Sequence, residues 1–331
     1  MEVGKTYLVT GATGYIGSML VRRLIHEGHQ VVALVRSKAK ARILLPEEAE
    51  ILAVDLTDDD AMRDLHIFCD YIVHFASITV SAEMRAHPAE VTQSIVNATQ
   101  NVLEMARRLR PKSVVYISSM EVYGDLDCSD GHRALEDEAG CGKVDVLAAR
   151  SCYPLGKRMA ENICAAYAME YKVPVKIARL AQTFGHGVLP DDRRVFAQFA
   201  RSAAKGEDIV LHTEGKSMGN YCAIEDTLAG LLLILEKGRD GEAYNVANEA
   251  TTMTIREMAE LAADAIAKGQ VRVTVDIPAD NRYGYAADTG LRLSSQKLRD
   301  LGWKPTKDLR QMFLDLKESL EEAGVAHNGA I

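Results

Sequence analysis

This chain lacks several features that would point to particular classes of protein. Its 331 residues include one tryptophan and six cysteines, and no two of these cysteines form a Cys-x-x-Cys pair. Without such a pair or a His-x-x-x-His companion, neither a zinc site nor a dithiol redox motif is supported, so we expect no bound metal. The cysteines are expected to be reduced thiols in a reducing compartment.

Long apolar runs are also missing. No run approaches the roughly 20 residues that span a bilayer. The N-terminus enters an expected strand within a few residues, without a basic and then apolar leader. These absences predict a cytoplasmic protein with no membrane partner.

An excess of positive charge is absent as well. The 39 Lys and Arg residues stand against 47 Asp and Glu residues, which gives a formal net charge of −8 at pH 7. Nucleic-acid binding needs clustered cations that displace counterions from phosphates, so we expect no nucleic-acid partner. The hydrophobic share of 47% and the charged share of 26% are ordinary for a folded globular protein.

The first half of the sequence alternates short β-rich runs with longer helical patterns. Strands are expected over residues 6–10, 30–35, 51–54, 71–75, 113–117 and 173–178, and helices over 15–27, 91–109 and 152–171. This alternation predicts an α/β fold with a Rossmann-type, doubly wound parallel sheet and a smaller mixed C-terminal substrate domain. We expect the cofactor domain to comprise residues 1–181 and 222–249, and the substrate domain residues 182–221 and 250–331.

The acidic stretch over residues 124–150 interrupts this alternation of expected strands and helices. It contains Asp127 and Asp130 among several acids, and it shows little periodicity. A segment of that length inside a compact domain is either a loop beside the active site or a solvated insertion.

Three glycines mark the first strand-to-helix turn. Gly11, Gly14 and Gly17 follow the first expected strand and open the helix after it. Glycine permits a tight turn and lets a pyrophosphate approach the helix N-terminus, where free N–H groups and the helix dipole favour negative charge. We therefore predict that a nicotinamide dinucleotide binds here, and the expected cofactor contacts also include Thr13, Tyr15, Ile16 and Ala76.

The end of the second strand bears on the choice of cofactor. An acid at this place would accept from the adenosine ribose and select NAD, but the strand ends in Val35-Arg36-Ser37-Lys38. Arg36 and Lys38 suit a 2′-phosphate, so NADP is favoured over NAD. Asp55 and Leu56 follow the third strand, where a carboxylate commonly accepts from the adenine amino group.

Tyr153 and Lys157 are spaced four residues apart at the start of an expected helix, so their side chains share one face. A cation beside a phenol stabilises the phenolate and lowers the phenol pKa, which would let Tyr153 exchange the proton of a sugar hydroxyl during hydride transfer. Ser119 follows the fifth strand, at the sheet edge where ligands of such folds bind. Ser119, Tyr153 and Lys157 are therefore the predicted catalytic residues.

With these residues, the chain resembles the extended short-chain dehydrogenase/reductases that modify nucleotide sugars, the NAD-dependent epimerase/dehydratase family. The resemblance extends from Thr10-Gly-Ala-Thr-Gly-Tyr-Ile-Gly17 through Tyr153-x-x-x-Lys157 to Leu301-Gly-Trp-Lys-Pro305. It implies NAD(P)-dependent oxidation at a sugar carbon, chemistry on the resulting ketone and often return of the hydride. It also implies that Lys157 anchors the nicotinamide ribose and that Glu121 influences the outcome.

Departures from the family patterns leave the reaction open. The 4,6-dehydratases typically have Thr-Asp-Glu where this chain has Ser119-Met120-Glu121, and Met120 cannot donate a proton. Glu121 and the stretch from Arg150 to Glu161 are similar to UDP-glucuronate decarboxylases. However, Gly219-Asn-Tyr-Cys222 lacks the Arg that these enzymes often carry there.

The resemblance also suggests how substrate and partner bind. Gln182 replaces an Asn that many relatives use near the diphosphate, and phosphate contacts are expected from Arg193, Arg194 and Arg292. Relatives dimerise through the helices expected here at 91–109 and 152–171, and the small residues of the second helix allow a homodimer.

The leading hypothesis is an epimerase or related nucleotide-sugar enzyme with a keto-sugar intermediate. Two alternatives remain open. Arg36 is compatible with an NADPH-dependent reductase of a 4-keto sugar or other carbonyl, and a non-catalytic NADP-binding sensor would use the same fold.

Overall fold

A seven-stranded parallel sheet forms the centre of the molecule. The computed structural model describes residues 4–126, 135–278 and 290–328. Strands β1 (Thr6–Thr10), β2 (Gln30–Val35), β3 (Glu50–Ala53), β4 (Tyr71–His74), β5 (Ser113–Ser119), β6 (Val175–Leu180) and β10 (Ala243–Val246) lie in the order β10-β6-β5-β4-β1-β2-β3. Every neighbouring pair in this sheet is parallel. Strands β6, β5, β4, β1 and β2 are central, and their apolar runs suit a sheet that is covered on both faces.

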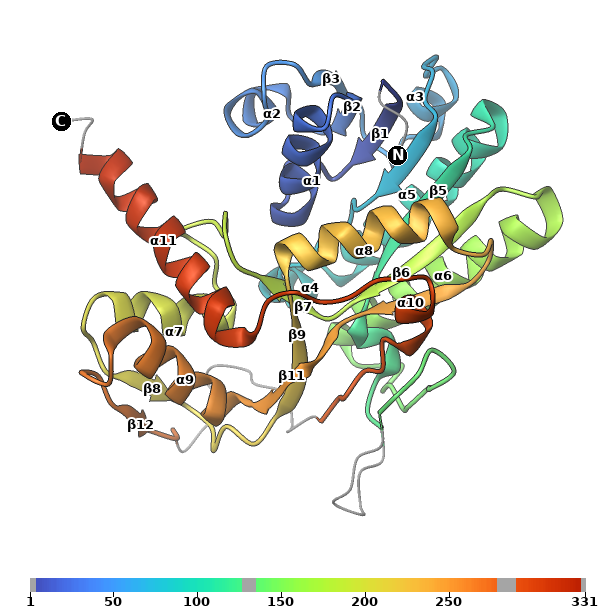
Figure 1. Cartoon of the computed structure of the whole chain (residues 1–331). Coiled ribbons are helices and arrows are strands. Elements are labelled where there is room, and N and C mark those ends of the chain that lie inside the picture. The colour runs from blue at the N-terminus through green and yellow to red at the C-terminus, as the bar shows by residue number, and fades with distance from the viewer. Residues whose placement is uncertain (1–3, 127–134, 279–289, 329–331) are drawn as a thin grey trace.

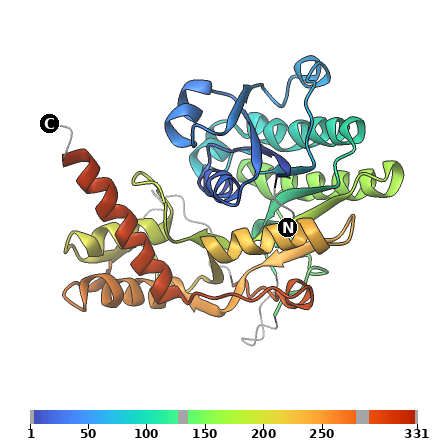
Figure 2. The same ribbon diagram turned by 45° about the horizontal axis from the view of Figure 1, so that its top comes forward.

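Helices cover both faces (Figure 1). On one face, α1 (Tyr15–His26) and α8 (Ile224–Lys237) pack against the sheet through a shared apolar core. On the other face, α5 (Pro88–Leu109) and α6 (Cys152–Tyr171) do the same through a second core. Figure 2 shows the two helix layers from another side. The expected α/β Rossmann-type class is therefore confirmed.

The direction of winding reverses beside β1. From β1 the chain adds β2 and β3 on one side, whereas β4, β5, β6 and β10 extend the sheet on the other. Ligands of doubly wound sheets bind at the carboxyl ends of the strands next to such a reversal. The glycine loop after β1 lies at this point.

A smaller mixed region adjoins the sheet. Strands β7 (Gln182–Phe184), β9 (Met218–Ala223) and β11 (Asn248–Thr254) form one sheet, and β8 (Ile209–Leu211) pairs with β12 (Val273–Val275). Helices α7 (Val195–Ala204), α9 (Ile255–Ala267) and α11 (Leu309–Asn328) pack around a core in which the rings of Phe184 and Phe196 stack, with centroids 4.3 Å apart. The expected smaller mixed region is therefore present.

Short elements connect the larger ones. These are α2 (Lys38–Leu44), α3 (Asp59–Arg63), α4 (Ser81–Ala86), α10 (Gln296–Asp300) and the 3-10 turns η1 (Met120–Tyr123) and η2 (Ala149–Ser151). Among helices of the described ranges, none has the length and apolar character needed to cross a membrane.

Candidate active site

The loop after β1 has the shape of a phosphate-binding turn. Gly11 has φ 65°, and the Gly14 amide donates to the Gly11 carbonyl oxygen at 3.0 Å. A Cβ on Gly17 would lie 2.4 Å from the same oxygen, so the close approach of α1 to the loop requires glycine. No side chain caps the N-terminus of α1, and its first turn contains no acid. These first-turn N–H groups and the helix dipole fit a pyrophosphate.

The same loop lies directly against the end of β4. A Cβ on Gly11 would lie 2.8 Å from the Ala76 amide nitrogen. That amide donates to the Thr10 hydroxyl at 3.2 Å. Gly11 and Ala76, both expected cofactor contacts, are thus neighbours at the reversal of strand order.

The positions beyond β2 and β3 are mostly open to solvent. Arg36 and Lys38 are exposed, and Ser37 caps α2 by accepting from the Lys40 amide. Asp55 is exposed, whereas Leu56 is buried. Hydrogen bonds from the Thr57 amide and hydroxyl, with a smaller effect of Arg36, hold the pKa of Asp55 below its ordinary value. Arg36 therefore acts electrostatically on Asp55 at this edge.

Ser119, Tyr153 and Lys157 converge at the carboxyl end of β5. Ser119 is the last residue of β5, and its side chain lies close enough to Tyr153, near the start of α6, to lower the pKa of that phenol. The Lys157 Nζ lies 5.8 Å from the centre of the Tyr153 ring and donates to the Ile117 carbonyl oxygen at 2.8 Å. The i, i+4 spacing on α6 and the length of β5 bring the three side chains together.

Burial dominates the electrostatics of these groups. It raises the pKa of Tyr153 above its ordinary value, the Glu121 carboxylate raises it further, and Ser119 and Arg150 act in the opposite direction. Burial also lowers the pKa of Lys157 to about 7. The expectation that Lys157 lowers the pKa of Tyr153 is therefore not met here, because desolvation disfavours both the phenolate and the ammonium.

Glu121 is paired with a cation that sequence reasoning missed. Glu121 lies on η1, directly after Ser119, and its carboxylate forms an ion pair with the Arg150 guanidinium at 2.8 Å. Arg150 lies on η2, directly before α6. The available signal was its place three residues before Tyr153.

A second, more deeply buried charge pair lies behind Lys157. The Ser118 hydroxyl donates to the Glu161 carboxylate at 2.5 Å, and the Arg179 guanidinium forms an ion pair with Glu161 at 2.7 Å. Glu161 lies one helical turn beyond Lys157 and, after burial, is the main neighbour that raises the pKa of Lys157. The i, i+4 spacing from Lys157 was the only sequence signal for it.

The four expected substrate contacts lie in different surroundings. Gln182 lies in β7, and its buried Oε1 is an acceptor without a hydrogen-bond partner among the described residues. Arg194 forms an ion pair with Asp192, and Arg193 is exposed. The Arg292 carbonyl oxygen accepts from the Glu136 amide at 2.7 Å.

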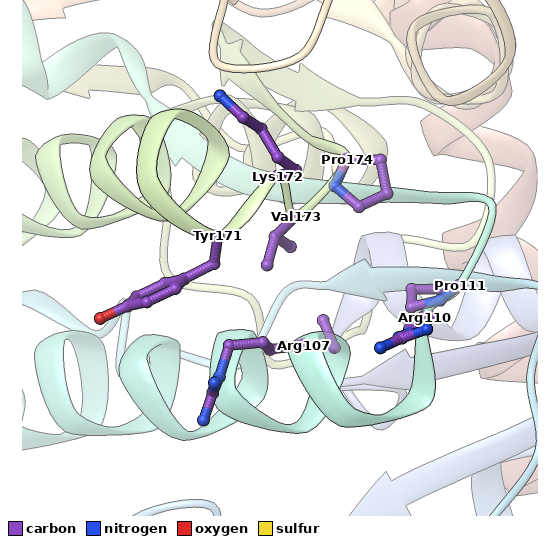
Figure 3. Close-up of a pocket in the computed structure, with 8 residues that line it drawn as sticks. Arg107, Arg110, Pro111, Tyr171, Lys172, Val173 and Pro174 are labelled. Atoms are coloured by element: carbon purple, nitrogen blue, oxygen red, sulfur yellow. The ribbon is translucent and has the colours of Figure 1, made fainter.

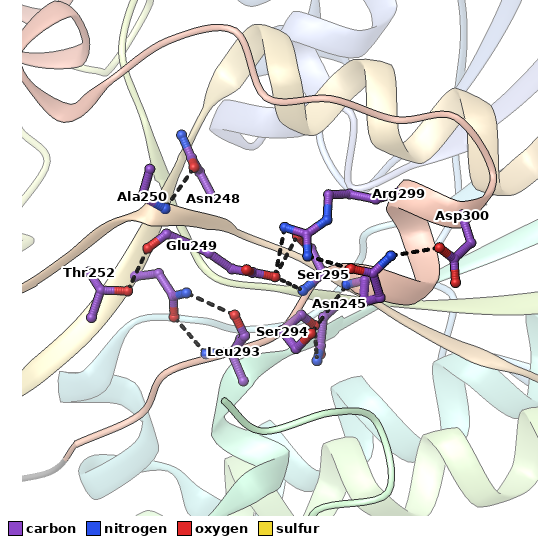
Figure 4. Close-up of polar contacts among 12 residues, drawn as sticks. Asn245, Asn248, Glu249, Ala250, Thr252, Leu293, Ser294, Ser295, Arg299 and Asp300 are labelled. Atoms are coloured by element: carbon purple, nitrogen blue, oxygen red, sulfur yellow. Dashed lines mark hydrogen bonds and ion pairs between the residues drawn. The ribbon is translucent and has the colours of Figure 1, made fainter. Parts of the chain in front are cut away.

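The described part of the acidic stretch lies against the C-terminal region. Besides the Glu136 contact with residue 292, the Asn245 side chain links this stretch to the C-terminal region, because it donates to the Glu136 carbonyl oxygen at 3.3 Å and to the Ser294 carbonyl oxygen at 3.0 Å. Figure 4 shows Asn245 beside Ser294. Asp127 and Asp130 lie outside the described residues.

A cavity of about 530 Å³ lies far along the helices from this site. It is lined by residues at the C-terminal ends of α5 and α6, including Arg107, Tyr171 and Lys172 (Figure 3). Ser119 lies at the end of β5 and Tyr153 at the start of α6, away from these helix C-termini, so the cavity is separate from the predicted catalytic residues.

Comparison with known proteins gives a consistent result. The model of the NAD dependent epimerase/dehydratase family matches residues 7–247. UDP-glucuronic acid decarboxylase 6 of Arabidopsis thaliana is 27% identical over 307 residues, which cover 92% of this chain and 85% of the relative. UDP-glucuronic acid decarboxylase 3 of the same plant is 28% identical, with the same coverage.

Solved structures share the fold. A UDP-glucose 4-epimerase of Thermotoga maritima, solved with UDP-glucose, has a TM-score of 0.83 at 21% identity and covers 96% of this chain and 99% of its own. A dTDP-glucose 4,6-dehydratase of Streptomyces venezuelae, solved with NAD bound, has a TM-score of 0.77 at 23% identity and covers 98% of each chain.

Proposed function

We propose that this chain, which belongs to the NAD dependent epimerase/dehydratase family, oxidises the sugar of a nucleotide-sugar substrate and acts on the resulting ketone. The family is that of NAD(P)-dependent enzymes. The likeness to UDP-glucuronic acid decarboxylases over 92% of the chain supports a nucleotide sugar as the substrate.

The convergence of Ser119, Tyr153 and Lys157 at the end of β5 carries this proposal. Tyr153 takes the proton of the reacting sugar hydroxyl, and Ser119, which lies beside Tyr153, donates to the same sugar oxygen. A bound nicotinamide supplies the hydride acceptor. Lys157 is held against the Ile117 carbonyl oxygen, close enough to Tyr153 to act on its charge.

The loop residues fit the dinucleotide. The uncapped first turn of α1 and the close packing at Gly11, Gly14 and Gly17 support a pyrophosphate there, with Thr13, Tyr15, Ile16 and Ala76 around it. Arg36 and Lys38 support NADP over NAD because both cations are exposed just beyond β2, where their charges suit a 2′-phosphate. Asp55 and Leu56 would contact the adenine.

The reaction on the ketone is epimerisation or decarboxylation. Met120 cannot donate the proton that elimination of water requires, which argues against a dehydratase. The relatives' names support decarboxylation, whereas the absence of an Arg at Gly219 favours epimerisation. Gln182, whose buried Oε1 needs a donor, would contact the substrate, with phosphate contacts from Arg193, Arg194 or Arg292.

Three further features belong to the same proposal. Residues 1–181 and 222–249 would bind the cofactor, and residues 182–221 and 250–331 the sugar. The chain would form a homodimer through α5 and α6. Five free cysteines among the described residues support a place in the cytoplasm.

Replacement of one phenol oxygen tests the catalytic assignment. The Tyr153→Phe variant should lose turnover by about 10²-fold or more, because the proton has no acceptor, and it should still bind NADP and NAD. The control is Tyr171→Phe, which removes a partly exposed phenol at the far end of the same helix. Turnover is followed by product analysis on a panel of UDP-, dTDP-, CDP- and GDP-sugars.

Two outcomes would contradict the proposal. If the Tyr153→Phe variant retained wild-type turnover, Tyr153 would not be the acid/base. If the wild-type protein turned over no nucleotide sugar but consumed NADPH with a simple ketone, the chain would be a reductase.

A further inference from the structure

Two short turns beside the predicted catalytic residues are joined by one ion pair. The turn η1 begins directly after Ser119, and the Ser119 hydroxyl accepts from the Glu121 amide at 3.2 Å. The turn η2 ends one residue before α6, which begins at Cys152 and carries Tyr153. Glu121 and Arg150 join these turns through contacts at 2.8 and 2.9 Å.

The guanidinium also lies near the phenol. The Arg150 Cζ is 5.9 Å from the centre of the Tyr153 ring, within the range of a cation–π contact. Arg150 and Glu121 are 38% and 35% exposed, whereas Tyr153 is 6% exposed. The pair is therefore more open to solvent than the phenol beside it.

The charges around Tyr153 come from several elements. Lys157 faces it from α6, and the Tyr116 phenol interacts with it from β5. Glu121 and Arg150 face it from η1 and η2. From α4, the Met84 carbonyl oxygen accepts from the neighbouring Cys152 thiol and adds no charge. Arg150 is thus the partner that balances the Glu121 carboxylate beside the phenol.

We propose that Arg150 is a positioning residue that holds Glu121 as a paired carboxylate and thereby leaves Tyr153 as the group that exchanges the proton. This inference rests on the proposed function. A paired Glu121 has its oxygens directed to the guanidinium, so it does not take the sugar proton. Arg150 also offsets the effect of the nearby carboxylate on the phenol.

Arg150 and Glu121 have opposite effects on the pKa of Tyr153. Burial and then Glu121 raise the pKa of Tyr153, while Arg150 lowers it. Replacing Arg150 with methionine leaves a bare carboxylate beside the phenol, so the phenolate is less stable. Replacing Glu121 with glutamine removes that carboxylate and has the reverse effect. The double replacement removes both charges together.

A double-mutant cycle tests the proposal. In single-turnover hydride transfer, the midpoint of the pH profile assigned to Tyr153 should rise by about one pH unit in Arg150→Met and fall in Glu121→Gln. The double variant should have a midpoint near that of the wild type. Arg150→Lys keeps the positive charge, so its midpoint should also stay near the wild-type value. The control pair is Arg23→Met and Glu27→Gln, an ion pair of 2.8 Å with exposures of 34% and 33%, and it should leave the midpoint in place.

A second readout does not require turnover. Labelled-tyrosine NMR titration of the cofactor-loaded protein, compared with the Tyr153→Phe counterpart of each variant, reports the Tyr153 phenol directly. The same order of midpoints is expected. Midpoints that move in one direction in both single variants, or that stay in place in Arg150→Met, would overturn the role of Arg150. Absence of turnover on every nucleotide sugar, with the expected order in the titration, would instead overturn the proposed function alone.

Discussion

At the scale of single residues, burial controls the charge of Lys157 more than its neighbours do. Its side chain is 2% exposed, and desolvation lowers its pKa to about 7 although Glu161 acts in the opposite direction. Arg179 forms an ion pair with Glu161 at 2.7 Å, and this pairing weakens the stabilisation of the Lys157 ammonium by the Glu161 carboxylate. Burial therefore disfavours the ammonium form of Lys157 in this structure.

This burial predicts a pH-dependent stability. The pKa of Lys157 is about 7 in the folded protein and about 10.4 in the unfolded chain, so between these values the unfolded chain binds more protons. The free energy of unfolding should therefore rise from pH 7 to pH 9 by on the order of 2 kcal/mol through this residue.

Urea denaturation of wild type and Lys157→Met at both pH values measures this contribution. The variant should lack the rise, so the difference between the two proteins should change with pH. Parallel pH dependence of the two proteins would show that Lys157 is not buried in the way described.

Arg36 should govern the choice between the two dinucleotides. Arg36→Asp places a carboxylate where the 2′-phosphate of NADP would lie, so the Kd for NADP should rise by at least about tenfold while the Kd for NAD falls or stays constant. Fluorescence titration with both cofactors measures this. The exposed Arg42 of α2 provides the matched control, Arg42→Asp. Equal losses for NADP and NAD would rule out a role in selecting the phosphate.

At the scale of elements, the glycine loop makes the sharpest steric prediction. A Cβ on Gly17 would lie 2.4 Å from the Gly11 carbonyl oxygen, so Gly17→Ala must shift α1 away from the loop. The Kd for the dinucleotide should rise by about tenfold or more, since the N–H groups of α1 lose their alignment.

Calorimetric titration of Gly17→Ala and Gly324→Ala tests this prediction. Gly324 lies in α11, where a Cβ meets nothing within 4 Å, so its variant should bind as the wild type does. Unchanged binding in Gly17→Ala would place the pyrophosphate elsewhere.

Six of the seven strands of the large sheet were predicted, because most of their apolar runs are buried on both faces, whereas β10 was not predicted. The strand at β1 and the helix at α6 begin and end as expected, while β5 continues through Ser118 and Ser119. That continuation was missed because two serines do not extend an apolar pattern, although both are paired in the ladder with β6.

The smaller region was predictable only as a mixed unit. Its strands β7, β8 and β12 have three residues each, which is too short for a periodic signal. One helix signal was present: Thr254 and Glu257 form a capping box at the start of α9. The other elements of the smaller region are held in place by tertiary packing around Phe184.

In the candidate site, too, local sequence signals could be recognised and contacts between distant residues could not. Tyr153 and Lys157 could be found because their spacing is local. The partners Arg150 and Glu161 could not, since Arg150 pairs with a residue 29 positions away and Glu161 accepts from one 43 positions away. Only the fold brings such pairs together.

At the scale of the whole molecule, hydrogen bonds join the C-terminal segment over residues 303–307 to α8. The Trp303 indole N–H donates to the Asp226 carbonyl oxygen at 2.9 Å, and the Asp226 carboxylate accepts from Thr306 and from the Lys307 amide. Asp226 is 3% exposed and lies in the first turn of α8. The Leu301-Gly-Trp-Lys-Pro305 stretch thus joins α11 to the large sheet.

Removal of this carboxylate should destabilise the protein as a whole. Asp226→Ala leaves three buried or partly buried donors without their acceptor, so the free energy of unfolding should fall by about 3 kcal/mol. Glu236→Ala, an exposed acid on the same helix, should change it by less than about 0.5 kcal/mol. Equal effects in the two variants, measured by urea denaturation, would show that these hydrogen bonds contribute little.

The most direct test of the central claim follows the bound cofactor during turnover. The wild-type protein, loaded with oxidised NADP or NAD, is mixed with each nucleotide sugar of the panel while absorbance at 340 nm is recorded. We predict a transient rise with at least one sugar, no such rise in Tyr153→Phe, and conversion of that sugar without net consumption of cofactor. Conversion of a nucleotide sugar with no reduced cofactor at any time, or with an equal rise in Tyr153→Phe, would contradict hydride transfer to the cofactor with Tyr153 as the proton acceptor.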